Sequence, residues 1–199
     1  MSNGAPGQLD LLGGIEDAKP RHRLFLALLP DEATRGAFVR TASSLKSMQA
    51  ASSARWVEPS RYHTTLHFLG DHARLRDDLV AAIRAAVDAV NMVPFAWTLD
   101  QAGSFRGHEL PLILLGTTTP EPLQQLWQRL QRALVLAGLG KSLERRFTPH
   151  VTLAYARDAL PATAIAPIEW HIDGFALLHS VLGQGDGYEV LGRWAFNDD

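Results

Sequence analysis

The sequence carries one motif twice, as Arg61-Tyr62-His63-Thr64-Thr65-Leu66-His67-Phe68-Leu69-Gly70 and as Phe147-Thr148-Pro149-His150-Val151-Thr152-Leu153-Ala154-Tyr155. Both stretches contain His-x-Thr-Leu inside an apolar run typical of a β-strand. With 8 histidines in 199 residues, a single His-x-Thr has little meaning, because short motifs also occur by chance. Two copies in opposite halves of the chain, each followed by Leu, indicate a shared site.

An extended strand would place each motif histidine beside a hydroxyl. Successive side chains of a strand point to opposite faces, so His63 and Thr65 project to one side, and His150 and Thr152 do the same. The same alternation predicts that His67 shares the face of His63. The two motif strands are therefore expected to face a common site.

The composition limits the chemistry of the chain. Its 199 residues suffice for one good-sized core, and no apolar run reaches the roughly 18 residues of a membrane span, so we expect a cytoplasmic protein. The absence of cysteine excludes disulfides, thiolate nucleophiles and cysteine-based zinc sites. A net charge of -2 argues against coating of long nucleic acid, but it is compatible with a small phosphorylated ligand or one RNA end.

The first half of the chain predicts alternating strands and helices. Residues 1–20 lack periodicity and are expected to be a disordered tail, which leaves 21–199 as a single domain. A continuous apolar run at 23–29 predicts a buried strand, followed by a helix at 31–50 that Asp31 would cap. The motif strand at 61–69 would lead to a second helix capped by Asp71, with apolar residues at helical spacing.

The second half predicts a hairpin, a long helix, the second motif strand and a closing strand pair. The expected elements are strands at 95–99, 110–115, 149–156, 168–182 and 188–196, and a long helix. A capping-box spacing at 118–121, with Pro near the first helical position, would begin this helix, and Gly138 or Gly140 would end it. Turns are expected at 106–108 and 183–187, and a Pro- and Ala-rich connection at 159–167. This mixture indicates an α+β fold of two antiparallel-sheet lobes, with outer helices around a central cleft.

Two imidazoles that face one another suit general acid-base catalysis. Imidazole changes charge near neutral pH, so one ring can be a neutral base while the other is a cationic acid. At phosphorus, one histidine would take a proton from water and the other would protonate the leaving oxygen, without a metal or a covalent intermediate. Thr65 and Thr152 would donate hydrogen bonds to the non-bridging phosphate oxygens.

Other residues near the motifs show weaker patterns. A metal site of His63, His67 and His150 is conceivable, but no carboxylate lies nearby and there is no helical His-x-x-x-His. Basic residues that could attract a phosphate are Arg61, Lys141, Arg145, Arg146 and Arg157. Aromatic residues that could stack on a base, although aromatics are more often buried, are Trp56, Phe105 and Phe147.

With these residues in view, the chain resembles the two-histidine phosphoesterase superfamily. Within it, the chain is similar to the RNA 2',3'-cyclic phosphodiesterases formerly called 2'-5' RNA ligases, or LigT-like proteins. The resemblance covers about residues 21–196 and rests on the signatures at 63–70 and 149–153. The closing residues Arg193-Trp194-Ala195-Phe196 also resemble the last strand of that family.

The resemblance implies a bilobal catalytic domain that needs no metal or other cofactor. Carried over by position, His63 and His150 are the acid-base pair, and Thr65 and Thr152 bind phosphate. The family opens a terminal 2',3'-cyclic phosphate to a 2'-phosphate, and we expect His63 to be the acid and His150 the base. The expected partners are RNA ends or small cyclic nucleotides, not a membrane, and we expect a monomer.

The chain departs from many of these relatives just after the second signature. They have Arg two residues beyond Thr-Leu, where this chain has Tyr155, with Arg157 two residues further on. Our hypothesis is that Arg145, which precedes the second signature, supplies the missing positive charge. Possible substrate contacts are therefore His67, Arg145, Phe147, Tyr155 and Arg157.

Three alternative functions are compatible with the same residues. A 2'-5' RNA ligase or 2'-5' phosphodiesterase would use the same acid-base pair on another linkage. A nucleotide-binding or RNA-end-binding module would hold phosphate without turnover. A metal hydrolase using His63, His67 and His150 would lose its activity in EDTA.

Overall fold

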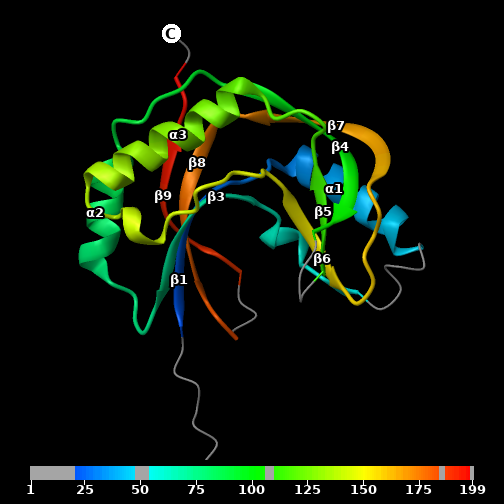
Figure 1. Ribbon diagram of the computed structural model, residues 1–199, viewed down its shortest axis with the longest axis horizontal. Coiled ribbons are helices and arrows are strands. Elements are labelled where there is room, and N and C mark those ends of the chain that lie inside the picture. Colours follow the sequence, from blue (N-terminus) through cyan, green and yellow to red (C-terminus); the bar gives the residue numbers. More distant parts are fainter. Residues whose placement is uncertain (1–20, 48–53, 106–109, 184–186, 198–199) are drawn as a thin grey trace, which may run out of the picture.

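The chain forms an α+β fold of two antiparallel sheets with outer helices, which confirms the expected fold class (Figure 1). The computed structural model describes residues 21–47, 54–105, 110–183 and 187–197. The predicted tail, the turn at 106–108 and most of the turn at 183–187 lie outside these residues. Within them, no helix combines the length and apolar character that a membrane crossing requires.

The first sheet has the strand order β3-β1-β8-β9. Its strands are β1 (His22–Leu28), β3 (Thr64–His72), β8 (Gly174–Val181) and β9 (Glu189–Ala195). Strand β1 lies between two neighbours and is buried on both faces, as its continuous apolar run predicts. Leu24 and Leu26 belong to the main core, whereas Phe25 and Ala27 form a second apolar cluster on the opposite face.

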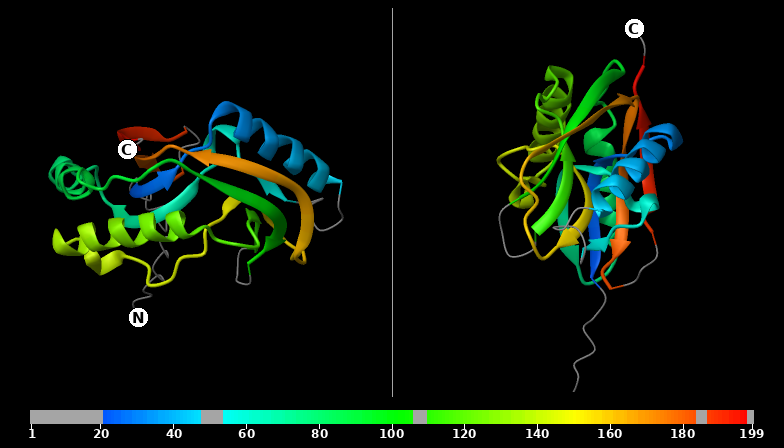
Figure 2. Two further views of the ribbon diagram at one scale, coloured as in Figure 1. Left: turned by 90° about the horizontal axis from the view of Figure 1, so that it is seen from above. Right: turned by 90° about the vertical axis from the view of Figure 1, so that its right-hand side faces the viewer.

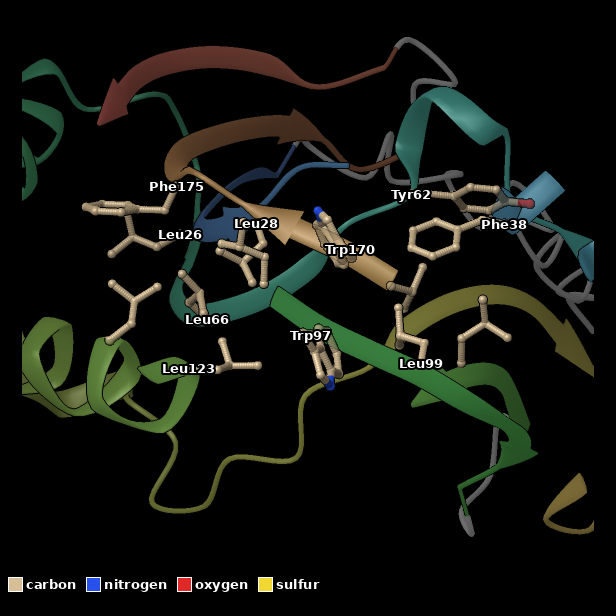
Figure 3. Packing of buried hydrophobic residues seen from close by; sticks show 14 of the residues in the cluster. Leu26, Leu28, Phe38, Tyr62, Leu66, Trp97, Leu99, Leu123, Trp170 and Phe175 are labelled. Carbon is tan, nitrogen blue, oxygen red and sulfur yellow. The ribbon is translucent and has the colours of Figure 1, made fainter. Parts of the chain in front are cut away.

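The second sheet has the strand order β2-β6-β5-β4-β7. Its strands are β2 (Arg55–Trp56), β4 (Phe95–Ser104), β5 (Leu110–Leu115), β6 (Val151–Ala156) and β7 (Thr163–Ile172). Trp97 on β4 pairs with Trp170 on β7, and their rings stack with centres 5.8 Å apart (Figure 3). The short strand β2 is not predicted by the sequence.

Three α-helices of the described chain pack on these sheets: α1 (Glu32–Lys46), α2 (Asp77–Val87) and α3 (Glu121–Leu136). Helix α1 lies at the opposite end of the molecule from α2 and α3 (Figure 2). It packs against β7, where Phe38 meets Trp170 edge-on at 5.7 Å (Figure 3). Helix α3 contacts α2, β3 and β4 and buries Leu123 completely, so Leu123→Ala should cost about 2 to 5 kcal/mol of stability.

Several predicted boundaries are wrong. A 3-10 helix occupies Pro59–Arg61, and β3 continues to His72 because its last residues still pair with β1. Asp71 therefore lies in the strand, where it pairs with Arg23, and it caps no helix. Helix α2 begins only after Arg76. Helix α1 ends at Lys46, short of the predicted residue 50.

The predicted strand at 168–182 is two strands in different sheets. Strand β7 pairs with β4 in the second sheet, whereas β8 pairs with β1 in the first. The chain passes between the sheets at Asp173 and Gly174. Only glycine fits at position 174, because a Cβ there would collide with the Trp194 carbonyl oxygen. Because the residues on both sides are apolar and suited to strands, the local pattern does not reveal this change of sheet. The predicted connection at 159–167 likewise includes the start of β7.

Both motif strands carry a β-bulge at the leucine that follows the motif threonine. The pairing skips Leu66 in β3 and Leu153 in β6. Since a bulge shifts the alternation of side chains, the next residue on the face of the threonine lies three positions further on. On each strand, we call the face that carries the motif threonine the motif face. Its residues are Thr65 and Phe68 on β3, and Thr152 and Tyr155 on β6.

The two bulges belong to a repeated arrangement. The order of strand, helix and motif strand occurs as β1, α1 and β3 and again as β5, α3 and β6. In each case the motif strand lies antiparallel beside the opening strand. The repeat thus presents two similar motif faces.

Candidate active site

The two signatures, far apart in sequence, meet at the starts of β3 and β6. His63 immediately precedes β3, and His150 immediately precedes β6. The hydroxyl of the fully buried Thr64 donates a hydrogen bond of 3.0 Å to the His150 carbonyl oxygen. The structure therefore brings both motif histidines into one site.

Both imidazoles are held by the same backbone contact. Nδ1 of His63 lies 2.8 Å from the Arg61 carbonyl oxygen, and Nδ1 of His150 lies 2.8 Å from that of Thr148. Because a carbonyl oxygen only accepts, Nδ1 of each ring must carry the hydrogen. Nε2 then bears the lone pair of each neutral ring and is the atom that can accept or return a proton.

The surroundings favour neutral imidazoles. The pKa of His63 is lowered to about 4, mainly by burial and to a smaller extent by the nearby His150 and Arg61 side chains, while its hydrogen bond to the Arg61 carbonyl opposes this decrease. Burial also lowers the pKa of His150, again opposed by its carbonyl contact. Since each positive charge disfavours another close by, one protonated and one neutral ring is the arrangement that a bound anion would stabilise.

Hydroxyl and aromatic groups complete the site. Nε2 of His63 lies 3.2 Å from Oγ1 of Thr65, so this hydroxyl reaches the atom that would exchange protons. The rings of Phe25 and Tyr188 each lie with centres 5.1 Å from that of His63. Phe105 meets the His150 ring edge-on at 4.8 Å. These contacts limit the rotation of both imidazoles.

The predicted position of His67 is wrong. The bulge at Leu66 turns His67 away from the motif face and into the core, where it is 1% exposed. Its Nε2 lies 2.9 Å from the Trp127 carbonyl oxygen, and its ring stacks on Trp127 at 5.2 Å. The three-histidine metal arrangement with His63 and His150 is therefore not formed.

The described residues also contain no other group of three or more histidine, aspartate or glutamate side chains arranged to hold a metal ion. The other residues predicted to contact the substrate lie in different surroundings. Tyr155 lies on the motif face of β6, beneath the Arg55 guanidinium, whose carbon is 4.7 Å from the ring centre. Phe147 instead stacks on Trp127 at 5.4 Å, so one of its faces is occupied by the protein.

Arg145 and Arg157 are exposed, and their side chains form no hydrogen bond or ion pair within the described chain. Sequence reasoning missed Phe25, Thr64 and Tyr188. Thr64 is the variable position of its motif. Phe25 lies on β1 and Tyr188 immediately precedes β9, and both are far in sequence from either signature. No local pattern marks these three residues as part of a site.

Solved structures share this fold. Escherichia coli LigT in its apo form matches with a TM-score of 0.71 and 26% identity, over 91% of this chain and 100% of that chain. Escherichia coli LigT complexed with 3'-AMP matches with a TM-score of 0.71 and 28% identity, over 90% and 99%. The fold and the paired signatures define a two-histidine phosphoesterase.

A family model described as the 2'-5' RNA ligase superfamily matches residues 34–184, and the chain belongs to this superfamily. An RNA 2',3'-cyclic phosphodiesterase of Thermus thermophilus is 31% identical over 193 residues, covering 89% of this chain and 91% of that protein. One of Methanothermobacter thermautotrophicus is 31% identical over 134 residues, covering 66% and 69%. The resemblance found in the sequence is confirmed.

Proposed function

We propose that this protein is an RNA 2',3'-cyclic phosphodiesterase that opens a terminal 2',3'-cyclic phosphate to a 2'-phosphate. The observation that carries the proposal is the meeting of two His-x-Thr signatures, with each Nδ1 held by a backbone carbonyl. The activity named for the relatives from two organisms supports it. RNA ends or small cyclic nucleotides would be the substrates of a cytoplasmic monomer.

In the proposed mechanism, Thr65 and Thr152 donate hydrogen bonds to the non-bridging phosphate oxygens. Nε2 of His150 takes a proton from water while the water oxygen bonds to phosphorus. The bond from phosphorus to the 3' oxygen breaks, and Nε2 of His63 gives that oxygen its proton. The negative phosphate opposes the effect of burial on the pKa of His63, which allows this imidazole to hold a proton in the complex.

Hydrolysis of a nucleoside 2',3'-cyclic phosphate in EDTA tests the proposal. We expect turnover by the wild type, a 2'-phosphate product identified by NMR, and loss of at least about a hundredfold in kcat for His63→Ala and for His150→Ala. A requirement for added metal would contradict the mechanism. Tight binding of a 2'-phosphate without turnover of any cyclic end would favour a binding module.

A 2'-5' RNA ligase activity of the same site is the second candidate, because the matching family model carries that description. In this reaction the 5' hydroxyl takes the place of water: His150 would take its proton while its oxygen bonds to phosphorus, the bond from phosphorus to the 3' oxygen breaks, and His63 would protonate that oxygen. The acid and base roles are therefore the same as in hydrolysis, and they exchange only when a 2'-5' linkage is cleaved. Incubating a cyclic-ended RNA with a 5'-hydroxyl RNA would separate the two activities by product length.

A further inference from the structure

Arg61 is a half-buried cation beside the active site. Its guanidinium carbon lies 5.0 Å from the centre of the Tyr188 ring, and that ring is in contact with His63. Its Nε is buried and has no hydrogen-bond partner among the described residues. No carboxylate of the described chain lies within ion-pair distance of Arg61.

Arg23, another arginine that lies over an aromatic ring near the motif face, is in a different state. Arg23 lies over Phe68 and makes two hydrogen bonds with Asp71, at 2.8 and 2.9 Å. Its charge is thus compensated within the protein. An uncompensated, partly buried guanidinium is costly unless an anion binds it, so Arg61 has the properties of a ligand-binding group.

Tyr188, which lies beneath Arg61, is one of two tyrosines of the described chain that have an arginine over the ring. Burial raises the pKa of the Tyr188 hydroxyl, and the nearby Arg61 opposes that increase. Tyr155, on the motif face of the second sheet, adds to the increase in the pKa of Tyr188. Each tyrosine also has an arginine over its ring, Arg61 over Tyr188 and Arg55 over Tyr155. Aromatic rings combined with cations are the groups that bind single-stranded nucleic acid.

The scissile phosphate already has its own set of partners in the proposed mechanism, namely the two histidines and the two threonines. Arg61 lies over Tyr188, and Tyr188 in turn contacts His63, so the guanidinium is next to this set without belonging to it. In an RNA strand, the nearest other anion is the phosphodiester that joins the terminal nucleotide to the one before it.

We infer that Arg61 binds the phosphodiester immediately 5' of the cyclic phosphate, and that the protein prefers RNA strands over free cyclic nucleotides. This inference rests on the proposed function. A contact with the backbone phosphate carries no base information, so the preference is for a strand and not for a sequence.

The experiment compares three substrates in EDTA: adenosine 2',3'-cyclic phosphate, a diadenylate ending in the same cyclic phosphate, and that diadenylate with a neutral methylphosphonate linkage. For the wild type, we expect kcat/KM to be about tenfold higher on the charged diadenylate than on the neutral one. Arg61→Gln should remove most of this ratio, and Arg61→Lys should retain part of it. Arg132→Gln, an exposed arginine on α3, is the matched control and should keep the ratio.

Each outcome bears on a different claim. Failure of the wild type to open any of the three substrates would overturn the proposed function itself. Turnover with equal kcat/KM on the charged and neutral diadenylates would overturn only the inference. An equal loss by Arg61→Gln on all three substrates would also overturn it, because Arg61 would then act at the scissile phosphate or on folding.

Discussion

The hydroxyl of Thr64 donates a hydrogen bond of 3.0 Å to the carbonyl oxygen of His150. Thr64 adjoins His63, so this one bond fixes the distance between the segments that carry the two imidazoles. The Thr64 side chain has no exposed surface, and water therefore cannot easily replace it as the donor. The geometry of the acid-base pair depends on this contact between the sheets.

Thr64→Val should lower both stability and activity. Valine has a similar shape but leaves the half-buried His150 carbonyl without this donor, which should cost about 1 kcal/mol in urea unfolding. Because small displacements of catalytic groups have large effects, kcat should fall by roughly tenfold or more. Thr64→Ser keeps the hydroxyl and should recover most of both losses. Wild-type kcat in a folded Thr64→Val protein would refute this role.

The pH dependence should differ between kcat/KM and kcat. Burial lowers the pKa of both His63 and His150 below the ordinary value of 6.5, to about 4 for His63. Because kcat/KM reports the free enzyme, its bell-shaped profile should have an optimum below pH 6.5. The bound phosphate stabilises imidazolium, so the kcat optimum should move to higher pH.

Rates on a nucleoside 2',3'-cyclic phosphate between about pH 4 and about pH 9, with EDTA present, test this prediction. A kcat/KM optimum well above neutrality would be inconsistent with the buried state of the two rings.

A substrate with a good leaving group should show which histidine is the general acid and which is the general base. A nucleotide 4-nitrophenyl phosphodiester needs little protonation of its departing oxygen, so loss of the acid should matter less than loss of the base. His63→Ala should therefore retain a larger fraction of wild-type kcat on this ester than His150→Ala does. The reverse order would exchange the proposed roles of the two histidines.

His67→Leu should change stability without changing catalysis at neutral pH. Burial lowers the pKa of His67, so at mildly acidic pH the unfolded chain binds a proton that the folded chain excludes. Folding stability from this group is therefore present at neutral pH and is lost as the pH falls below the ordinary histidine value. His67→Leu lacks this titration, and its unfolding free energy should fall less steeply with acid.

Urea unfolding at about pH 7 and about pH 5 measures this difference. His171→Gln is the control, because that side chain is exposed and makes no hydrogen bond within the described residues. A folded His67→Leu protein with little kcat at neutral pH would mean that His67 takes part in the reaction after all.

Patterns confined to one segment predicted their elements well. The apolar stripe at 123–137 predicts a long helix, and α3 spans Glu121–Leu136. The capping box predicted at 118–121 is wrong, because Pro120 is the N-cap residue and no side-chain hydrogen bond caps the helix. Pairing between segments accounts for the errors. Leu66 and Leu153 bulge only because of how their strands align with β1 and β5, so simple alternation misplaces His67. The change of sheet at Gly174 is likewise absent from the local pattern.

The sequence by itself determined the α+β class and the residue types of the chemistry, because each His-x-Thr signature is complete within one short segment of the chain. Only the tertiary structure decided what surrounds those residues. Phe25 and Tyr188 meet at His63 from two separate segments, since the order β3-β1-β8-β9 brings distant parts of the chain together. Proximity of this kind arises from long-range strand pairing, which local side-chain periodicity does not encode.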